Sequence, residues 1–446
     1  MKIAFVDSVG DCAPVAYHCE LSGNKVLYLL TDKDDINSQR VLDGMVDKAK
    51  SVKDIIAFNP DVVVCYQDPE AGVQLQKAGI PYVGPSEESI ELEEDRLLAM
   101  KLCKKYGCGE VPRVMEFSDR RKALEFVKND ENEAWVFKAE GGESDTSTTH
   151  VCETKAEMAA VIEYEADRSA SNFILQEKID GVEISIEGWF DYRKGWIYPI
   201  NSTFERKELF NDDKGPKMGC TGSIVFIWPE DEPRLFKETL QNFTPYLEEI
   251  KYVGPFDGNF IVADDDHKPY FLEFTPRLGW NAFSAFMAGY DRDVGEMFAR
   301  LAAGNLSALS FRDAFMGAVR VYIPTTENMP IVAPWRGDHH FYPINVWFDG
   351  TRLRSTGSAD ESGFSAIFDA GTSRDTIPEI MEKIYERVIP RIQVPAISYR
   401  TDIGKQAQKD IGKLKDWGYT LPEQAPDRGV APRAMTQMMG ARKVRS

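Results

Sequence analysis

The sequence predicts an α/β protein with additional α+β parts, on three observations. Short apolar runs alternate with helix-like segments over residues 1–85, which is typical of a parallel sheet with crossover helices. Two strand-like runs joined by a polar turn span residues 256–277. Apolar residues make up 43% of the chain and charged residues 28%, the profile of a globular protein.

In the N-terminal part, apolar runs at 3–6, 26–30, 61–66 and 81–83 predict the parallel strands. An open sheet of this kind binds ligands at the carboxyl ends of its strands. Residues 89–106 follow, with leucines near helical spacing, acids in the first half, lysines late and Gly107 as a stop. They predict one helix that joins the first domain to the second.

The middle of the chain predicts a compact unit with strands at 135–138, 149–151, 173–177 and 183–190 and a helix at 155–167. The loop at 140–149 is rich in glycine and hydroxyl side chains and follows Lys138. Small residues let backbone N–H groups approach an anion, so this loop is a candidate phosphate-binding loop. A solvated hairpin is the alternative interpretation.

The last third predicts an α+β unit, with strand-like runs at 317–323 and 364–368 and a helix at 376–388. Beyond Leu421 the chain turns to Pro, Gly, Met and basic residues without periodicity. The domains we expect are therefore an N-terminal parallel α/β domain (1–95), a central domain (96–310) with a lid at about 110–190, a C-terminal α+β domain (311–420) and a loose basic tail (421–446).

Charge and composition exclude several classes of function. The formal net charge of -19 argues against an extended surface for nucleic acid or for an anionic membrane. No apolar run approaches the roughly 20 residues that a membrane helix needs. The 7 cysteines form no close pairs of the kind expected for zinc or a redox motif. The first apolar run is too short for a signal peptide, so we expect a cytoplasmic protein with small-molecule partners.

The second strand of the 256–277 pair carries a chemical pattern. Period-two alternation places Glu273, Thr275 and Arg277 on one face. A carboxylate that holds Mg²⁺ beside an arginine that neutralises phosphoryl oxygens is what ATP-driven activation of a carboxylate requires, because charge develops on those oxygens in the transition state. A solvated strand face is the alternative.

Eight motifs in order carry a family resemblance. They are DPEA (68–71), GPS (84–86) followed by LE (92–93), FKA (137–139), LQEKIDGVE (175–183), Lys207, GP (215–216) with Gly219 and Gly222, EFTPRLG (273–279) and YRTDIG (399–404). In this order the chain resembles the glycinamide ribonucleotide synthetase family, also called phosphoribosylamine–glycine ligases, within the ATP-grasp superfamily. The likeness extends over about residues 1–410.

The resemblance implies an ATP-grasp fold between the two flanking domains, and a stepwise ligation. The γ-phosphoryl group of ATP passes to a carboxylate, and an amine attacks the acyl phosphate to give an amide, ADP and phosphate. Catalysis is then mainly positioning and charge neutralisation. The cofactors implied are ATP and Mg²⁺, with Mn²⁺ as a possible substitute. The substrates implied are a carboxylate such as glycine and an amine, and the oligomeric state stays open.

The resemblance also assigns roles to residues. Arg96 stands where the family has its first phosphate-binding lysine, and Lys138 matches the second. Adenine would lie near Lys178 and Ile179, with a contact from Glu177. Glu183 would reach the ribose or the metal ion. Arginine binds phosphate as a planar fork, so the exchange at Arg96 preserves an anion contact. The implied catalytic residues are Lys138, Lys207 and Arg277, and the implied metal ligands are Glu273, Thr275 and Asn259.

Thr275 stands where the family usually has asparagine, and a neutral hydroxyl is a weaker ligand for Mg²⁺. A site with one carboxylate would therefore depend on the phosphates of ATP to hold its metal ion. A nucleotide-binding protein that has lost turnover is the alternative that this weak set of ligands leaves open. A scaffold that contacts an acidic partner through the basic tail is a further alternative.

The substrate-binding residues depart most from the family pattern. The expected set is Glu70, Glu205, Gly215, Pro216, Lys217, Gly219, Asp7 and Asp11. The loop after the first strand reads DSVGDCAP (7–14), and two acids near an expected phosphate are repulsive. Charge alone therefore favours a neutral or cationic amine, while phosphoribosylamine remains the other candidate.

Overall fold

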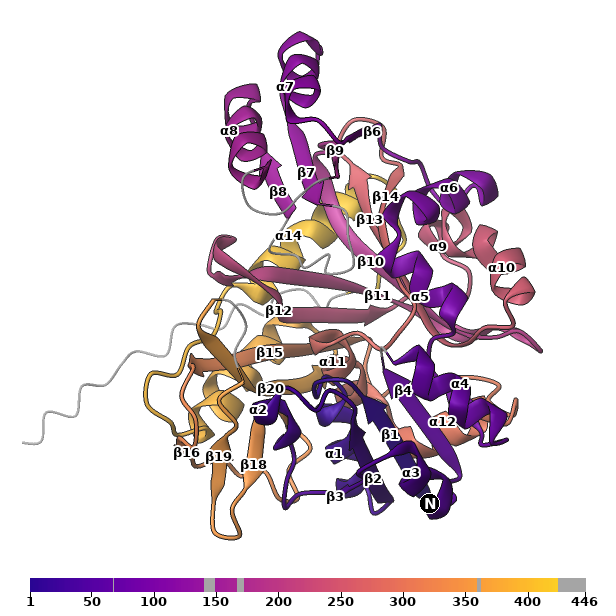
Figure 1. Cartoon of the computed structure of the whole chain (residues 1–446), viewed down its shortest axis with the longest axis vertical. Coiled ribbons are helices and arrows are strands. Elements are labelled where there is room, and N and C mark those ends of the chain that lie inside the picture. The colour runs from indigo at the N-terminus through magenta and orange to yellow at the C-terminus, as the bar shows by residue number, and fades with distance from the viewer. Residues whose placement is uncertain (67, 140–148, 167–171, 359–361, 424–446) are drawn as a thin grey trace, which may run out of the picture.

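A computed structural model of the chain describes residues 1–66, 68–139, 149–166, 172–358 and 362–423. The N-terminal part forms a five-stranded parallel sheet in the order β3-β2-β1-β4-β5 (Figure 1). Its strands are β1 (Lys2–Asp7), β2 (Lys25–Leu30), β3 (Asp47–Lys48), β4 (Val62–Tyr66) and β5 (Tyr82–Val83). Its helices are α1 (Ala13–Leu21), α2 (Ile36–Gln39), α3 (Val52–Phe58) and α4 (Pro69–Lys77). The four predicted strands are confirmed, with the short β3 in addition.

The single helix predicted at 89–106 is wrong. The chain forms α5 (Glu87–Glu94) and α6 (Arg96–Tyr106), which are separated at Asp95 by extended backbone with φ -100° and ψ 92°. The Asp95 carboxylate accepts a hydrogen bond of 2.9 Å from the backbone N–H of Leu98 and so caps the second helix. The break places Arg96 in the first turn of α6, where the helix dipole favours a bound anion.

The middle segment contains a four-stranded antiparallel sheet in the order β6-β9-β7-β8. Its strands are β6 (Val114–Phe117), β7 (Trp135–Ala139), β8 (Thr149–Cys152) and β9 (Phe173–Glu177), and its helices are α7 (Arg120–Asn129) and α8 (Lys155–Ala166). The unit has a core of its own, in which the rings of Phe137 and Phe173 stack at 4.8 Å. Figure 1 shows it at the opposite end of the molecule from the N-terminal sheet. Residues 140–148, the predicted phosphate loop, lie outside the described residues.

An eight-stranded sheet in the order β14-β13-β10-β11-β12-β15-β20-β17 joins the central and C-terminal segments. Its strands are β10 (Gly181–Asp191), β11 (Gly195–Phe210), β12 (Lys214–Ile227), β13 (Val253–Ala263), β14 (Pro269–Thr275), β15 (Phe315–Pro324), β17 (Phe341–Pro343) and β20 (Phe364–Arg374). The predicted hairpin at 256–277 is confirmed as β13 and β14. Helices α9 (Arg234–Glu238), α10 (Leu240–Glu249), α11 (Asn281–Gly289) and α12 (Val294–Ala302) accompany this sheet.

The C-terminal part adds a small sheet in the order β16-β19-β18, formed by β16 (Pro330–Ile331), β18 (Val346–Phe348) and β19 (Leu353–Ser355). The helix predicted at 376–388 is regular only over α13 (Ile377–Lys383) and continues as a π-helical turn at Ile384–Val388. A 3-10 turn at Ile389–Arg391 and α14 (Ile403–Asp416) follow. The predicted tail passes outside the described residues from residue 424, and the predicted domain boundaries stay a prediction.

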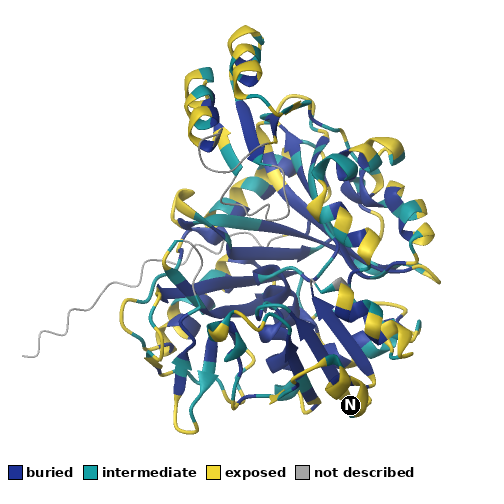
Figure 2. Ribbon diagram, viewed as in Figure 1, coloured by how far each residue is buried: buried dark blue, intermediate teal, exposed yellow. Residues whose placement is uncertain are grey.

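Burial follows the layers of the fold. Figure 2 shows the strands of the large sheet and the N-terminal sheet mostly buried, while the helices at the periphery expose one face. The large sheet nevertheless carries many polar side chains near its center, which is unusual for a packed core. Within the part of the chain that the structure describes, no helix is both long and apolar enough to cross a membrane.

Candidate active site

Four of the predicted charged residues, Glu183, Glu205, Lys207 and Glu273, lie on one face of the eight-stranded sheet. In the register of the strands, Ser185 on β10 lies opposite Asn259 on β13 and opposite Thr203 on β11, and Asn259 in turn lies opposite Glu273 on β14. Because side chains two residues apart share a face, Glu183, Glu205 and Lys207 belong to the same surface. Non-local strand pairing therefore assembles this face from four separate segments.

Lys207 links the two carboxylates of this face. Its Nζ lies 2.9 Å from Oε1 of Glu183 and 3.8 Å from Oε1 of Glu273. The negative charge of Glu183 is the main cause of the raised pKa of Lys207, and Lys207 in turn lowers the pKa of Glu183. All three groups are therefore ionised near neutral pH.

Lys138 approaches the same face from β7 of the smaller sheet. Its side chain is buried, and burial together with the positive charge of Arg96 lowers its pKa to about 7, against the opposing effect of Glu273. The Nε of Arg96 is buried and has no hydrogen-bond partner among the described residues. Two neighbouring cations, one of which has a buried donor without a partner, form a site that a polyphosphate would satisfy.

Arg277 is held by residues of the N-terminal part. Its Nε donates to both carboxylate oxygens of Glu93 on α5, at 2.9 and 3.1 Å, and its Nη2 donates to Oε1 at 2.6 Å. Nη1 donates to the hydroxyl of Tyr66 at the end of β4. These two anchors fix the guanidinium at the carboxyl edge of the parallel sheet, where such sheets bind ligands.

The charges of Lys138, Glu273 and Arg277 meet at one place. Burial would raise the pKa of Glu273, but the charges of Lys207, Arg96, Lys138 and Arg277 together lower it below its ordinary value. Glu273 is thus an ionised carboxylate surrounded by cations. An acid, a lysine and an arginine from three parts of the chain thus lie within electrostatic range of one another, and their convergence on a bound nucleotide stays a prediction.

The three predicted metal ligands are neighbours on β13 and β14. Asn259 lies opposite Glu273, and Thr275 lies opposite Asp257. The amide nitrogen of Asn259 donates to Oδ1 of Asp257 at 3.3 Å, which leaves its carbonyl oxygen available. In the described ranges there is no group of three or more His, Cys, Asp or Glu side chains that could hold a metal ion. One carboxylate with neutral oxygens fits Mg²⁺ that is also bound by ATP phosphates.

The residues predicted to contact adenine lie where β9 leads into β10. Glu177 accepts contacts of 3.4 Å from the side chain of Asn132 and from the backbone N–H of Arg113. The ammonium group of Lys178 pairs with Glu153 at 3.1 Å and with Asp180, so its charge is satisfied outside the Lys138 cluster. Ile179 is half-buried in the connecting loop. The backbone N–H of Glu177 donates to the carbonyl of Arg113 at 2.9 Å, and the adenine contact implied for Lys178 and Ile179 stays a prediction.

The two acids of the loop after β1 differ in position. Asp7 is fully buried and accepts hydrogen bonds from the backbone N–H of Cys12 at 2.6 Å and from the hydroxyl of Tyr28 at 2.7 Å. It therefore positions the loop and does not present its carboxylate to a substrate. Asp11 is half-buried; burial raises its pKa, and the nearby charges of Arg277 and Arg320 oppose that rise. Asp11 stays the candidate for a substrate contact.

The glycines of β12 have different roles. Gly219 has φ +72°, and a Cβ there would lie 2.0 Å from Cζ3 of Trp280, so this position excludes any side chain. Gly215 and Pro216 are exposed near the start of β12, and Lys217 is half-buried. The expected phosphate contacts of these residues stay a prediction.

Glu70 and Glu205 complete the predicted substrate set. Glu70 is exposed in the first turn of α4. Glu205 is half-buried on the shared face. Its pKa is raised, mainly by burial and also by the negative charges of Glu183 and Glu273, although the positive charge of Lys207 opposes this rise. Only Glu205 is therefore in electrostatic contact with the Lys207 cluster.

Sequence reasoning missed several polar residues of the site. Glu187 and Asp257 lie on the shared face, directly opposite each other on β10 and β13. The alternation 183, 185, 187 on one strand and 257, 259 on the other contains the signal. Arg320 on β15 was also missed; it forms a buried ion pair with Asp369 on β20, with Nε 2.8 Å from Oδ1.

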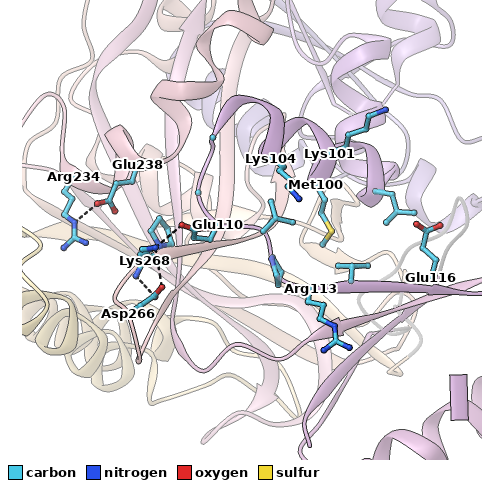
Figure 3. A pocket seen from close by; sticks show the side chains of 17 residues that line it. Met100, Lys101, Lys104, Glu110, Arg113, Glu116, Arg234, Glu238, Asp266 and Lys268 are labelled. Atoms are coloured by element: carbon cyan, nitrogen blue, oxygen red, sulfur yellow. Dashed lines mark hydrogen bonds and ion pairs between the residues drawn. The ribbon is translucent and has the colours of Figure 1, made fainter. Parts of the chain in front are cut away.

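A separate cavity of about 1230 Å³ lies between α6, the segment 107–116 and the β13–β14 turn (Figure 3). Some of its charges pair with one another, as Lys268 does with Glu110 at 3.2 Å and Arg234 with Glu238 at 2.8 Å. No residue of the predicted site lines it. This cavity flanks the connection to the smaller sheet and is distinct from the Lys138–Glu273–Arg277 site.

Comparison with known proteins agrees with this geometry. Residues 95–281 match the family model described as phosphoribosylglycinamide synthetase, ATP-grasp (A) domain. The chain is 25% identical over 366 residues to the chloroplastic phosphoribosylamine–glycine ligase of Arabidopsis thaliana, a match that covers 77% of the chain and 66% of the relative. It is 23% identical over 446 residues to the phosphoribosylamine–glycine ligase of Methanosarcina barkeri, covering 93% of the chain and 99% of the relative.

Solved structures show the same architecture. The crystal structure of a phosphoribosylamine–glycine ligase from Thermotoga maritima superposes with a TM-score of 0.69 at 18% identity, covering 90% of the chain and 100% of the neighbour. The biotin carboxylase domain of a Hydrogenobacter thermophilus 2-oxoglutarate carboxylase gives a TM-score of 0.61 at 14% identity, covering 93% and 95%.

The smaller sheet that brings Lys138 over the Glu273 face of the larger sheet defines an ATP-grasp fold, and the predicted fold class is confirmed. A parallel-sheet part precedes this unit and supplies the anchors of Arg277. Residues 95–281 thus match the ATP-grasp (A) domain of phosphoribosylglycinamide synthetase, and the chain is similar over most of its length to phosphoribosylamine–glycine ligases, as a divergent relative.

Proposed function

We propose that this protein uses ATP to activate a small carboxylate and joins it to an amine, with release of ADP and phosphate. The observation that carries the proposal is the convergence of Lys138, Glu273 and Arg277 on one site. A carboxylate becomes a good electrophile only after it gains a leaving group. The protein's contribution is then to position the reactants and to neutralise phosphoryl charge.

The side chains present fit both implied cofactors. Arg96, whose Nε is an unused donor, and the neighbouring Lys138 would hold the phosphates of ATP. Glu273, with the neutral oxygens of Asn259 and Thr275, would hold Mg²⁺, or Mn²⁺, which also accepts oxygen ligands. The bound metal ion supplies neutralisation of the transferring phosphoryl group. Arg277, held by Glu93 and Tyr66, supplies a further fixed positive charge.

We infer the substrates from the names of the relatives and from the charges of the site. Glycine is the proposed carboxylate, and phosphoribosylamine and a different small amine are the two candidates for the acceptor. Asp11 beside Arg277 supports an amine with little negative charge. A cytoplasmic location belongs to the same proposal, and the seven cysteines, which are all free and buried, support it.

A second candidate is a protein that binds ATP without turnover. The weak metal set favours it, since Glu273 is the only carboxylate among the three predicted ligands. Such a protein would retain the phosphate contacts of Arg96 and Lys138 and would lack the geometry that phosphoryl transfer requires.

The deciding experiment measures ADP release with ATP and Mg²⁺, using glycine with phosphoribosylamine in one arm and glycine with a panel of other amines in the other. We expect ADP release that requires both substrates and that disappears in Glu273→Gln. Asp265→Asn, an exposed change in the β13–β14 turn, is the matched control. ATP binding without ADP release from any substrate pair would favour the second candidate.

A further inference from the structure

The polar face of the large sheet continues past Glu273 into a cluster of oxygen atoms, here called the oxygen cluster and formed by Glu187, Asp257, Asn201 and Thr203. Glu187 lies opposite Asp257 on one side and opposite Asn201 on the other. Thr203 is two residues from Asn201 and so shares its face. Three neighbouring strands thus bring two carboxyls, an amide and a hydroxyl together.

Three atoms of the oxygen cluster have no partner among the described residues: Oε1 of Glu187, Oδ1 of Asn201 and Oγ1 of Thr203. The three side chains are 5%, 0% and 1% exposed. The amide nitrogen of Asn201 donates to Oε2 of Glu187 at 3.2 Å, which orients both groups and leaves the other two oxygens free. A buried oxygen that accepts no hydrogen bond costs folding free energy, so these three oxygens indicate that a ligand supplies the donor.

The charge of the oxygen cluster is also uncompensated. Neither Glu187 nor Asp257 forms an ion pair with a lysine or arginine in the described ranges, whereas Glu183 and Glu273 share Lys207. Burial raises the pKa of Glu187 to about 7. Glu205 and Glu273, the other charged groups that act on this pair, are acids as well.

The oxygen cluster adjoins the reaction site through Asp257. Asp257 is half-buried, in contrast to the deeply buried Glu187, and it lies opposite Thr275. Asn259 donates to Asp257 at 3.3 Å and faces Glu273 across the strands. A molecule beside Glu273 and Arg277 would therefore meet the oxygen cluster through Asp257.

We propose that the oxygen cluster binds the ammonium group of a small organic substrate. An ammonium group donates three hydrogen bonds, which matches the three orphan acceptors, and its charge would offset the paired acids. A metal ion is the less suitable occupant, since the described residues hold no group of three or more His, Cys, Asp or Glu placed for one. The proposal rests on the proposed function and names the substrate class that the site would select: an amino acid or a cationic amine.

The test compares ligands that differ only in the ammonium group. Glycine is compared with glycolate, and ethanolamine with ethylene glycol, by isothermal titration calorimetry of the full chain with ADP and Mg²⁺ present. The first pair tests an amino-acid source of the ammonium group and the second pair an amine source. Glu187→Gln, Asp257→Asn and the double variant remove the charge while preserving shape, and Asp265→Asn is the control.

We expect at least one ammonium ligand to bind roughly tenfold or more tightly than its hydroxyl analogue, as hydrogen bonds to charged groups allow. The double variant should lose this preference, while nucleotide affinity and melting temperature confirm that it is folded. Equal binding of amines and alcohols, or a preference that survives in the double variant, would overturn the proposal. Binding of Mg²⁺ without nucleotide that vanishes in Glu187→Gln would overturn it in favour of a metal.

These results separate the inference from the proposed function. If ADP is never released but the ammonium preference depends on Glu187 and Asp257, the oxygen cluster is a binding site in a protein without turnover. If ADP is released and the preference is absent, the ligase proposal stands and the inference fails.

Discussion

The two ends of one sheet face handle charge in opposite ways. At the nucleotide end, the acids Glu183 and Glu273 share the cation Lys207, and two further cations face them. At the other end, Glu187 faces Asp257 without a cation. Compensated charge indicates a site prepared for an anion such as polyphosphate, whereas uncompensated acid indicates a site prepared for a cation. The difference shows that one face of a sheet can bind two ligands of opposite charge next to each other.

The strongest test of this comparison removes the arginine between the two ends. Arg277→Gln should reduce ADP-forming turnover by about 10²-fold, because a fixed charge that stabilises phosphoryl transfer is lost. Steady-state kinetics with the active substrate pair measures the effect. Nucleotide affinity should change much less, since Arg96 and Lys138 remain. Arg300→Gln, a change on the exposed side of α12, is the control. Unchanged turnover would remove Arg277 from the reaction.

The nucleotide end should respond to pH through Lys138. Its pKa of about 7 in the ligand-free protein lies below the ordinary value, so the side chain is charged below pH 7 and loses its proton as the pH rises. Nucleotide affinity should therefore fall above pH 7, by up to about tenfold per pH unit, because binding must take up a proton. Calorimetric titrations of ADP from pH 6 to pH 9 measure this slope.

Lys138→Met supplies the control for that slope. This variant should bind ADP weakly at every pH and should show no such fall, because no group remains to take up the proton. A slope that persists in the variant would assign the pH dependence to another residue.

A smaller effect is expected when the predicted metal ligand Thr275 is replaced by a better ligand. Thr275→Asn replaces a hydroxyl by an amide carbonyl, a better ligand for Mg²⁺, and should lower the Mg²⁺ concentration for half-maximal ADP release by about three- to tenfold. A titration of Mg²⁺ at fixed ATP measures this change. Thr275→Val should move the requirement in the other direction. If both variants behave as the parent protein does, residue 275 does not contact the metal ion.

The smallest effect concerns stability at the acidic end. Glu187 has a folded-state pKa of about 7, above the ordinary value, so the folded state favours its protonated form. The stability that protonation provides is fully present below the unfolded-state pKa and is lost as the pH rises through about 7. Glu187→Gln should therefore raise the melting temperature at pH 8 by a few degrees and leave it nearly unchanged at pH 4.5. Thermal unfolding at both pH values in the absence of substrates checks this sign.

The sequence predicts the parts of this molecule that depend on local pattern. The apolar runs of β1, β2, β4 and β5 are visible because each strand is buried on both faces. The helix predicted at 89–106 fails at Asp95, because that residue both fits the acidic first half and caps a new helix. Local periodicity cannot distinguish these two uses of an aspartate.

The site residues also divide into those that a local sequence pattern predicts and those that depend on the assembled sheets. The alternation on β14 and the order of motifs identify Lys138, Glu273 and Arg277 in advance. Glu187 escapes notice because its partner Asp257 lies far away in the chain and because strand register alone places Asn201, on the next strand, opposite it. Asp7 was expected to face a substrate, but its burial depends on Tyr28 of the neighbouring strand. Register and burial are properties of the assembled sheets, so no single segment reveals them.

The anchoring of Arg277 limits how the molecule can be recombined. Its guanidinium follows β14, yet the groups that orient it, Tyr66 and Glu93, belong to β4 and α5. A chimera that takes its parallel sheet from a relative would keep the arginine and discard its orientation. Any exchange of domains between related proteins must therefore transfer Arg277, Tyr66 and Glu93 together.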